Sequence, residues 1–322
     1  MRMRWKLVFA RSNRVARCAT GLNCPEELWM KKISLTVVVL SLAGLGFCLV
    51  SSSKTELRAD PQAAKKARML MVTTSKTFTH GPVKREKEEL APAEVAITQL
   101  GQTSGLFTVD CTQDPAKDLT PENLKNYDIV FFYTQGPDLD IPKENMEFFL
   151  NTWLKQKGNG FVATHSSTDT YGEYEPYWDM IGGTFNGHPW NAGETVTISV
   201  HGTRHPGTRM WGEEFTIKDE IYQYTHWQPD KVRVLMSLNM AKCTTKAPHH
   251  VPVAWVKKYG DGKVFYTNLG HNTETWANKQ FIESLTGGIK WVMGLEEGDA
   301  TPNPEVSKVQ EDKAKADAAT SK

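Results

Sequence analysis

The stretch PKENMEFFLNTWLKQKGNGFVATH, residues 142–165, decides the fold class. In its first part, apolar residues at positions 146, 149, 150, 153 and 154 share one helical face, between Pro142 at the start and Gly158 at the end. Residues 160–165 then form a short apolar run that ends on His165, as a strand buried on both faces does. A helix followed at once by a buried strand is the repeating unit of a parallel α/β sheet.

The same alternation continues on both sides of this stretch. We predict strands at residues 69–74, 107–111, 128–133, 160–165, 195–200, 232–238, 251–256 and 263–269. Helical periodicity marks residues 92–100, 142–157 and 279–293. Strands that alternate with helices predict a mainly parallel sheet covered on both faces.

The two ends of the chain differ from its middle. Basic residues over positions 2–32 precede an apolar run at 33–50 and then three serines, the order of an export signal. We expect residues 1–53 to be a cleaved signal or a membrane anchor, with Met1 or Met30 as the start, and the rest to be periplasmic or extracellular. Residues 54–68 are predicted to be a linker, 69–295 the single domain and 296–322 a disordered polar tail.

Composition and missing motifs exclude several classes of function. The net charge is +1, so we expect no nucleic-acid partner, and membrane contact only through the N-terminal segment. No G-x-G-x-x-G follows the first predicted strand, which argues against a bound dinucleotide. No G-x-S-x-G or H-E-x-x-H is present, which argues against a serine nucleophile and against that type of zinc protease.

Histidines follow three of the predicted strands. His80, His165 and His271 come at or just after the ends of the runs at 69–74, 160–165 and 263–269. Because ligands bind beyond the carboxyl ends of parallel strands, we expect the three side chains to converge if those strands are neighbours. They would act as acids and bases or as metal ligands, with Glu220 as a base, a further ligand or a solvated charge.

Imidazoles with a carboxylate suit a divalent transition metal such as zinc with an open position for water, although no spacing here is diagnostic of one. Metal-free imidazole catalysis therefore stays open. Polar and aromatic residues in loops are candidates to line a substrate pocket by ring stacking and amide hydrogen bonds. They are Asp169, His188, Trp190, Asn191 and Tyr222.

Several of these residues lie in segments that resemble the trehalose-utilisation (ThuA-like) family. The matching segments are FTH at 78–80, GFVATHSSTDT at 160–170, IGGTFNGHPWN at 181–191, DEIYQ at 219–223, PVAW at 252–255 and GKVFYTNLGH at 262–271. The resemblance implies a class I glutamine amidotransferase-like (flavodoxin-like) fold, a three-layer α/β/α sandwich. It also implies that residues 164–166 form the turn that carries the nucleophilic cysteine in those amidotransferases. Here the turn holds His165, so a glutaminase is not expected.

The family points to disaccharide breakdown, and some relatives are linked with sugars oxidised to 3-keto forms. The implied partner is a small carbohydrate, and the implied reaction is that of a hydrolase, lyase or isomerase. Removing a proton next to a carbonyl needs a base and an electrophile, which clustered imidazoles can supply with or without a metal. The alternative is a non-catalytic module that binds carbohydrate or protein. A third hypothesis is a purely structural envelope protein, but such a protein would not need convergent polar groups at the strand ends.

Overall fold

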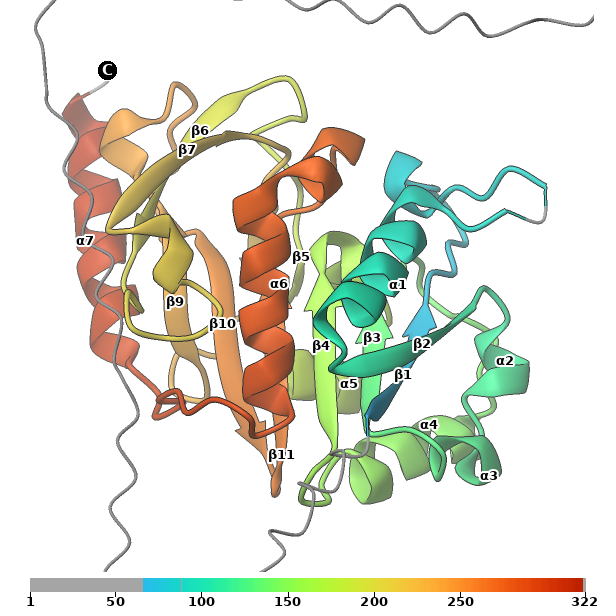
Figure 1. Ribbon diagram of the computed structural model, residues 1–322. Coiled ribbons are helices and arrows are strands. Elements are labelled where there is room, and N and C mark those ends of the chain that lie inside the picture. Colours follow the sequence, from blue (N-terminus) through green and yellow to red (C-terminus); the bar gives the residue numbers. More distant parts are fainter. Residues whose placement is uncertain (1–65, 88, 321–322) are drawn as a thin grey trace, which may run out of the picture. The chain divides into compact units, whose positions relative to one another are not determined.

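The computed structural model describes residues 66–87 and 89–320 (Figure 1). Its centre is a nine-stranded sheet in the order β2-β1-β3-β4-β11-β10-β9-β6-β7, and β5 pairs with β8 separately. The strands are β1 (Ala67–Val72), β2 (Phe107–Thr112), β3 (Ile129–Phe132), β4 (Gly160–Thr164), β5 (Thr184–Phe185), β6 (Thr195–Val200), β7 (Glu214–Lys218), β8 (Tyr224–Thr225), β9 (Arg233–Leu238), β10 (Pro252–Tyr259) and β11 (Gly262–Thr267). The helices are α1 (Pro92–Ser104), α2 (Pro115–Asp118), α3 (Pro121–Leu124), α4 (Lys143–Phe148), α5 (Glu175–Ile181), α6 (Lys279–Val292) and α7 (Pro304–Thr320).

The sheet has a parallel and an antiparallel half. Strands β2, β1, β3, β4 and β11 run parallel, whereas β10, β9, β6 and β7 add antiparallel pairs. Each predicted strand region contains an observed strand. Strand β7 was not predicted because Ile217 is its one buried residue, so no apolar run marks this edge.

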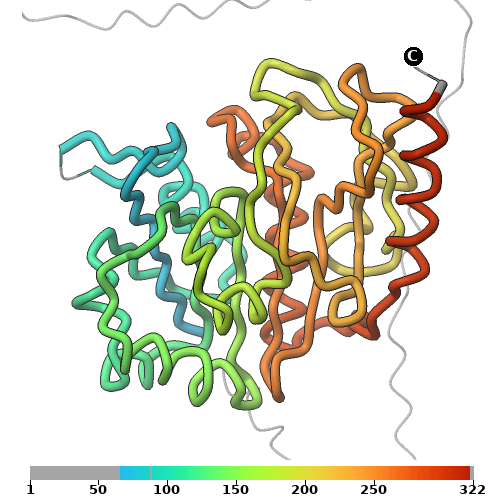
Figure 2. The backbone as a smooth tube through the Cα atoms, turned by 180° about the vertical axis from the view of Figure 1, so that it is seen from behind, coloured from blue at the N-terminus to red at the C-terminus, as the bar shows by residue number. Residues whose placement is uncertain are grey.

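Helices cover both faces of the sheet, which confirms the predicted fold class. Helices α1 and α6 lie in front of the sheet in Figure 1, and α4 and α5 lie on the side that faces the reader in Figure 2. Successive strand residues point to opposite faces. Accordingly, Phe131 belongs to the buried cluster that contains Ile97 of α1 and Phe281 of α6, while Phe132 packs with Phe149 and Tyr177 on the other side.

The helix predicted at 142–157 is interrupted. After α4 the chain forms a π-helical turn over Phe149–Trp153. This turn keeps Phe149, Leu150 and Trp153 buried against the sheet. The apolar face that the sequence indicates is therefore preserved although the helical hydrogen-bond pattern changes.

The predicted disorder of residues 296–322 is wrong for the described part of that tail. Residues 304–320 form α7, which packs along β9 and buries Ala314. Just before it, the Asn303 side chain accepts from Val234 N at 2.7 Å and donates to Val234 O at 3.0 Å. The buried Ala314 and the two hydrogen bonds of the Asn303 amide hold residues 303–320 against the sheet, although these residues include no aromatic side chain.

The predicted export segment and most of the linker lie outside the described residues. Among the helices within residues 66–320, none is both long enough and apolar enough to cross a bilayer.

Candidate functional site

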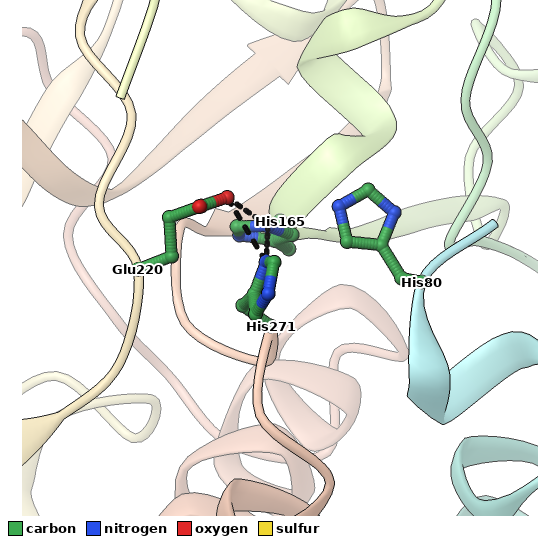
Figure 3. Close-up of side chains that lie close together, drawn as sticks. All are labelled: His80, His165, Glu220 and His271. Carbon is green, nitrogen blue, oxygen red and sulfur yellow. Dashed lines mark hydrogen bonds and ion pairs between the residues drawn. The ribbon is translucent and has the colours of Figure 1, made fainter. Parts of the chain in front are cut away.

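The three strand-end histidines lie together at one edge of the sheet. Strands β1, β4 and β11 belong to the run β1-β3-β4-β11, so the loops after them share that edge. One ring nitrogen each of His80, His165 and His271 and one oxygen of Glu220 all lie within 4.8 Å of one another. Figure 3 shows the four side chains pointing toward a common centre. We call these four residues the histidine–glutamate cluster.

Three members of the cluster are in direct contact. His271 Nδ1 lies 2.9 Å from Glu220 Oε2 and 3.1 Å from His165 Nε2. His165 Nε2 lies 3.4 Å from Glu220 Oε2. His165 Nδ1 lies 2.8 Å from the carbonyl oxygen of Asn268, which can only accept, so Nδ1 carries the proton. In the neutral ring, the Nε2 lone pair of His165 therefore faces the other members of the cluster.

These contacts have the dimensions of a metal coordination shell. Bonds of about 2.1 Å to one ion place neighbouring ligand atoms about 3.0 Å apart at right angles and about 3.4 Å apart in a tetrahedron. The observed contacts between Glu220, His165 and His271 are 2.9, 3.1 and 3.4 Å. The hydrogen bond from the far ring nitrogen of His165 to a carbonyl is the support that metal-bound histidines usually have. The cluster is thus one that could bind a metal.

The protonation states of two members also suit a cation. Burial, reinforced by the nearby His165 and His271, lowers the pKa of His80 to about 2, so its ring is neutral near pH 7. Burial disfavours the Glu220 carboxylate, but its interactions with His165 and His271 outweigh burial and lower its pKa. The cluster therefore offers a neutral imidazole and a carboxylate, both of which can bind a divalent ion.

His165 occupies a sharp turn directly after β4. It opens a 3-10 helix, His165–Asp169, and has a φ of +42°, a value that side-chain-bearing residues rarely adopt. Such a backbone conformation costs about 1–3 kcal/mol and persists only where the surroundings enforce it. The residue at this strained turn is a buried histidine whose ring reaches the cluster.

Asp219 fixes the loop that carries His271, a function that sequence reasoning missed. Its carboxylate accepts from Gly270 N at 2.8 Å, Asn272 N at 3.0 Å and Thr275 Oγ1 at 3.1 Å. Gly270 has a φ of +122°, which lets its amide turn toward Asp219. Of the two neighbouring acidic residues, Glu220 places its carboxylate in the cluster, and Asp219 places its carboxylate against the loop that carries His271.

Asn268 is the second residue that sequence reasoning missed. Its side chain accepts from Tyr222 N at 3.1 Å and donates to Tyr222 O at 3.0 Å, while its carbonyl holds His165. The Tyr222 hydroxyl lies 3.2 Å from His80 Nε2, and its ring centroid lies 4.2 Å from that of His165. The site therefore brings in the predicted Tyr222, buried against two cluster histidines.

Two further predicted residues lie beside the cluster. His188 is half exposed, and its Nδ1 lies 3.2 Å from Glu220 Oε1, the oxygen that does not face His271. Asp169 is partly buried and accepts from Gln135 Nε2 at 2.8 Å. Burial raises the pKa of Asp169, although the hydrogen bond from Gln135 opposes this.

Two predicted pocket residues have other roles. Trp190 is fully buried in the core, and its indole donates to Thr245 O at 2.9 Å, so neither ring face is open to a ligand. Asn191 is exposed and bonds within its own turn, to Glu194 and to Gly193 N. The G-H-P-W-N motif therefore contributes His188 to the site, while its Trp and Asn stabilise the loop.

Known proteins share this architecture. A ThuA-like protein from Bacteroides uniformis is 21% identical, with 76% of this chain and 97% of the other covered and a TM-score of 0.56. For a ThuA-like protein from Parabacteroides merdae the identity is 15%, the coverages are 75% and 99%, and the TM-score is 0.57. At these identities the likeness shows the fold alone. No curated protein matches the chain significantly.

The family model for ThuA, described as trehalose utilisation, matches residues 68–292, which is most of the described part of the chain. The range includes every member of the histidine–glutamate cluster. The resemblance drawn from the sequence is thereby confirmed, and a carbohydrate-related role follows from it. The chain belongs to the ThuA (trehalose utilisation) family.

Proposed function

We propose that this protein is an exported enzyme of disaccharide or keto-sugar breakdown, with a divalent transition metal such as zinc held by the histidine–glutamate cluster. The observation that carries the proposal is the cluster itself, with its coordination-like spacing and its hydrogen-bonded far nitrogen at His165. A bound ion there would polarise a substrate oxygen and lower the pKa of a bound water.

The surrounding residues suit the handling of protons. Glu220 joins two environments, because Oε2 faces the buried His165 and His271 while Oε1 faces the half-exposed His188. We infer that His188 passes protons between Glu220 and the substrate or solvent, as a general base or acid. Tyr222 keeps its proton, because burial raises the pKa of its hydroxyl, and we infer that it donates to a developing oxyanion.

The proposed place of action rests on the N-terminal residues. Basic residues before the apolar run at 33–50 favour export to the periplasm or beyond, with or without an anchor. The expected partner is a small carbohydrate. Because a net charge of +1 gives no overall basic field, we expect no nucleic-acid partner.

Metal content tests this proposal first. After zinc loading and dialysis, we measure the zinc content by inductively coupled plasma mass spectrometry. The proteins are the full chain and its His165→Ala, His271→Ala and His249→Ala variants. His249 is the control, because it contacts Gln223 and lies outside the cluster. We expect about one ion per chain in the wild type and the control, and loss in both cluster variants, by the ligand logic above. Equal binding in all four proteins, or none in the wild type, would contradict the metal site.

Turnover then separates an enzyme from a binding module. Trehalose and 3-keto-trehalose are incubated with wild type and with His165→Ala, and products and affinity are measured separately. An enzyme loses turnover in the variant, whereas a binding module shows no turnover in either protein and changes only in affinity.

A further inference from the structure

Phe78 is an exposed aromatic ring next to the cluster. Of the exposed large apolar side chains within residues 66–320, it is the only aromatic one and, at 57%, the most exposed. Its ring packs edge-on against His80, with centroids 4.8 Å apart and planes at 82°. A single exposed apolar residue needs no explanation, but one that touches a buried cluster histidine does.

The backbone under Phe78 is held rigidly. The buried Gln135 accepts from Thr77 N at 3.1 Å and from Phe78 N at 3.0 Å through the same Oε1. Its own backbone carbonyl accepts from Lys76 N at 2.9 Å. Gln135 Nε2 donates to Asp169 Oδ2 at 2.8 Å. One glutamine thus joins the backbone of Phe78 to a carboxylate of the site, and a preorganised backbone lowers the entropy cost of binding a ligand there.

Further aromatic rings border the cluster around Tyr222. Phe185 packs against Tyr222 with centroids 4.4 Å apart and lies 6.0 Å from the His188 ring. Tyr222 in turn covers His165. Aromatic rings in contact with imidazoles and close to carboxylates suit a ligand that has apolar C–H faces and hydroxyl edges, as a pyranose has.

We propose that Phe78 is the platform on which the C–H face of a sugar ring stacks beside the histidine–glutamate cluster, with Asp169 accepting from that ring's hydroxyls. Gln135 is a positioning residue that sets the distance between platform and carboxylate. The inference rests on the proposed carbohydrate function and adds to it that the ligand is a closed pyranose ring rather than an open-chain polyol.

Calorimetric titration of the full, zinc-loaded chain with trehalose, 3-keto-trehalose and the open-chain polyol sorbitol tests the platform. The variants are Phe78→Ala, Phe78→Leu and Phe78→Tyr, and the control is Leu295→Ala, whose side chain is 55% exposed outside the site. We expect both Phe78→Ala and Phe78→Leu to weaken disaccharide binding by about tenfold, with Phe78→Tyr near wild type, because only an aromatic face stacks. Metal content should stay unchanged, and turnover should show a raised KM with kcat nearly constant.

Two results would overturn the platform while leaving the proposed function intact. One is wild-type affinity in Phe78→Ala, and the other is an equal loss in Leu295→Ala. A wild type that binds none of the sugars but retains its metal would instead overturn the carbohydrate function, and the platform with it. Sorbitol binding that falls in parallel with disaccharide binding would refute recognition of a closed ring.

Discussion

Asp219→Asn tests whether the His271 loop is held by a buried carboxylate. Asp219 is fully buried, and its oxygens accept from two donors each: Oδ2 from Gly270 N and Thr275 Oγ1, Oδ1 from Asn272 N and Glu220 N. The amide keeps the shape of the side chain but turns one oxygen into a donor. In either rotamer, at least one backbone N–H is left without an acceptor.

The expected cost follows from the number of lost acceptors. A buried donor without a partner costs about 1–3 kcal/mol. In either rotamer two donors face the new amide group. In one rotamer, one of these two donors is the Thr275 hydroxyl, which is rotatable. We therefore expect Asp219→Asn to lower the free energy of unfolding by about 2–4 kcal/mol. Because Gly270 and Asn272 flank His271, metal affinity should also fall about 10- to 100-fold, as for other residues that support metal ligands.

Urea denaturation measures the first effect, on chelator-treated protein so that metal binding does not add to stability. A competition titration with a zinc indicator measures the second. The control is Asp261→Asn, in the exposed turn between β10 and β11. If Asp219→Asn matched this control in both measurements, the carboxylate would not be what holds the loop.

Three other changes test the fold and its pH dependence. Gly270→Ala should cost about 1–3 kcal/mol in the same denaturation assay, because alanine at a φ of +122° is strained; an unchanged midpoint would contradict this. Asn303→Ala should cost about 2–3 kcal/mol by leaving both main-chain groups of Val234 unpaired, and an unaltered stability would mean that water replaces the amide. Burial lowers the pKa of His205 from 6.5 to about 4. Above pH 6.5 the ring is neutral in both the folded and the unfolded chain, so it carries no penalty. As the pH falls from 6.5 to 4, only the unfolded chain takes up the proton, and the free energy of unfolding decreases. His205→Gln should remove about one proton from that slope, about 1.4 kcal/mol per pH unit, and parallel curves for the two proteins would refute it.

The sequence predicts the inner strands of the parallel half of the sheet well because they are buried on both faces. Continuous apolar runs mark β1, β3, β4 and β11, and a polar residue at the end of a run marks the edge where the site lies. His80, His165 and His271 could be found in this way. The antiparallel edge strand β7 was not predicted, since a strand with one buried residue has no apolar run.

The supporting residues could not be predicted from one sequence. Asn268 bonds Tyr222 across 46 positions, and Asp219 bonds Gly270 across 51, so neither pair leaves a local pattern. Trp190 shows the opposite error. A tryptophan beside a loop histidine suggests a sugar platform, but its large ring is fully buried in the core, and the exposed aromatic ring of the site is Phe78.

The restraints on His165 bear on whether the site performs chemistry. Its backbone is strained at a φ of +42°, its Nδ1 is tied to the Asn268 carbonyl, and its ring lies against Tyr222. Each restraint limits the direction of the same lone pair, on Nε2, and the strain alone costs stability. A module that only binds sugar gains nothing from aiming a buried lone pair, because exposed amides and rings recognise hydroxyls without strain. A metal ligand or a base must be aimed to within a fraction of an ångström, and a strained turn that fixes the direction of the ring is what the proposed function requires.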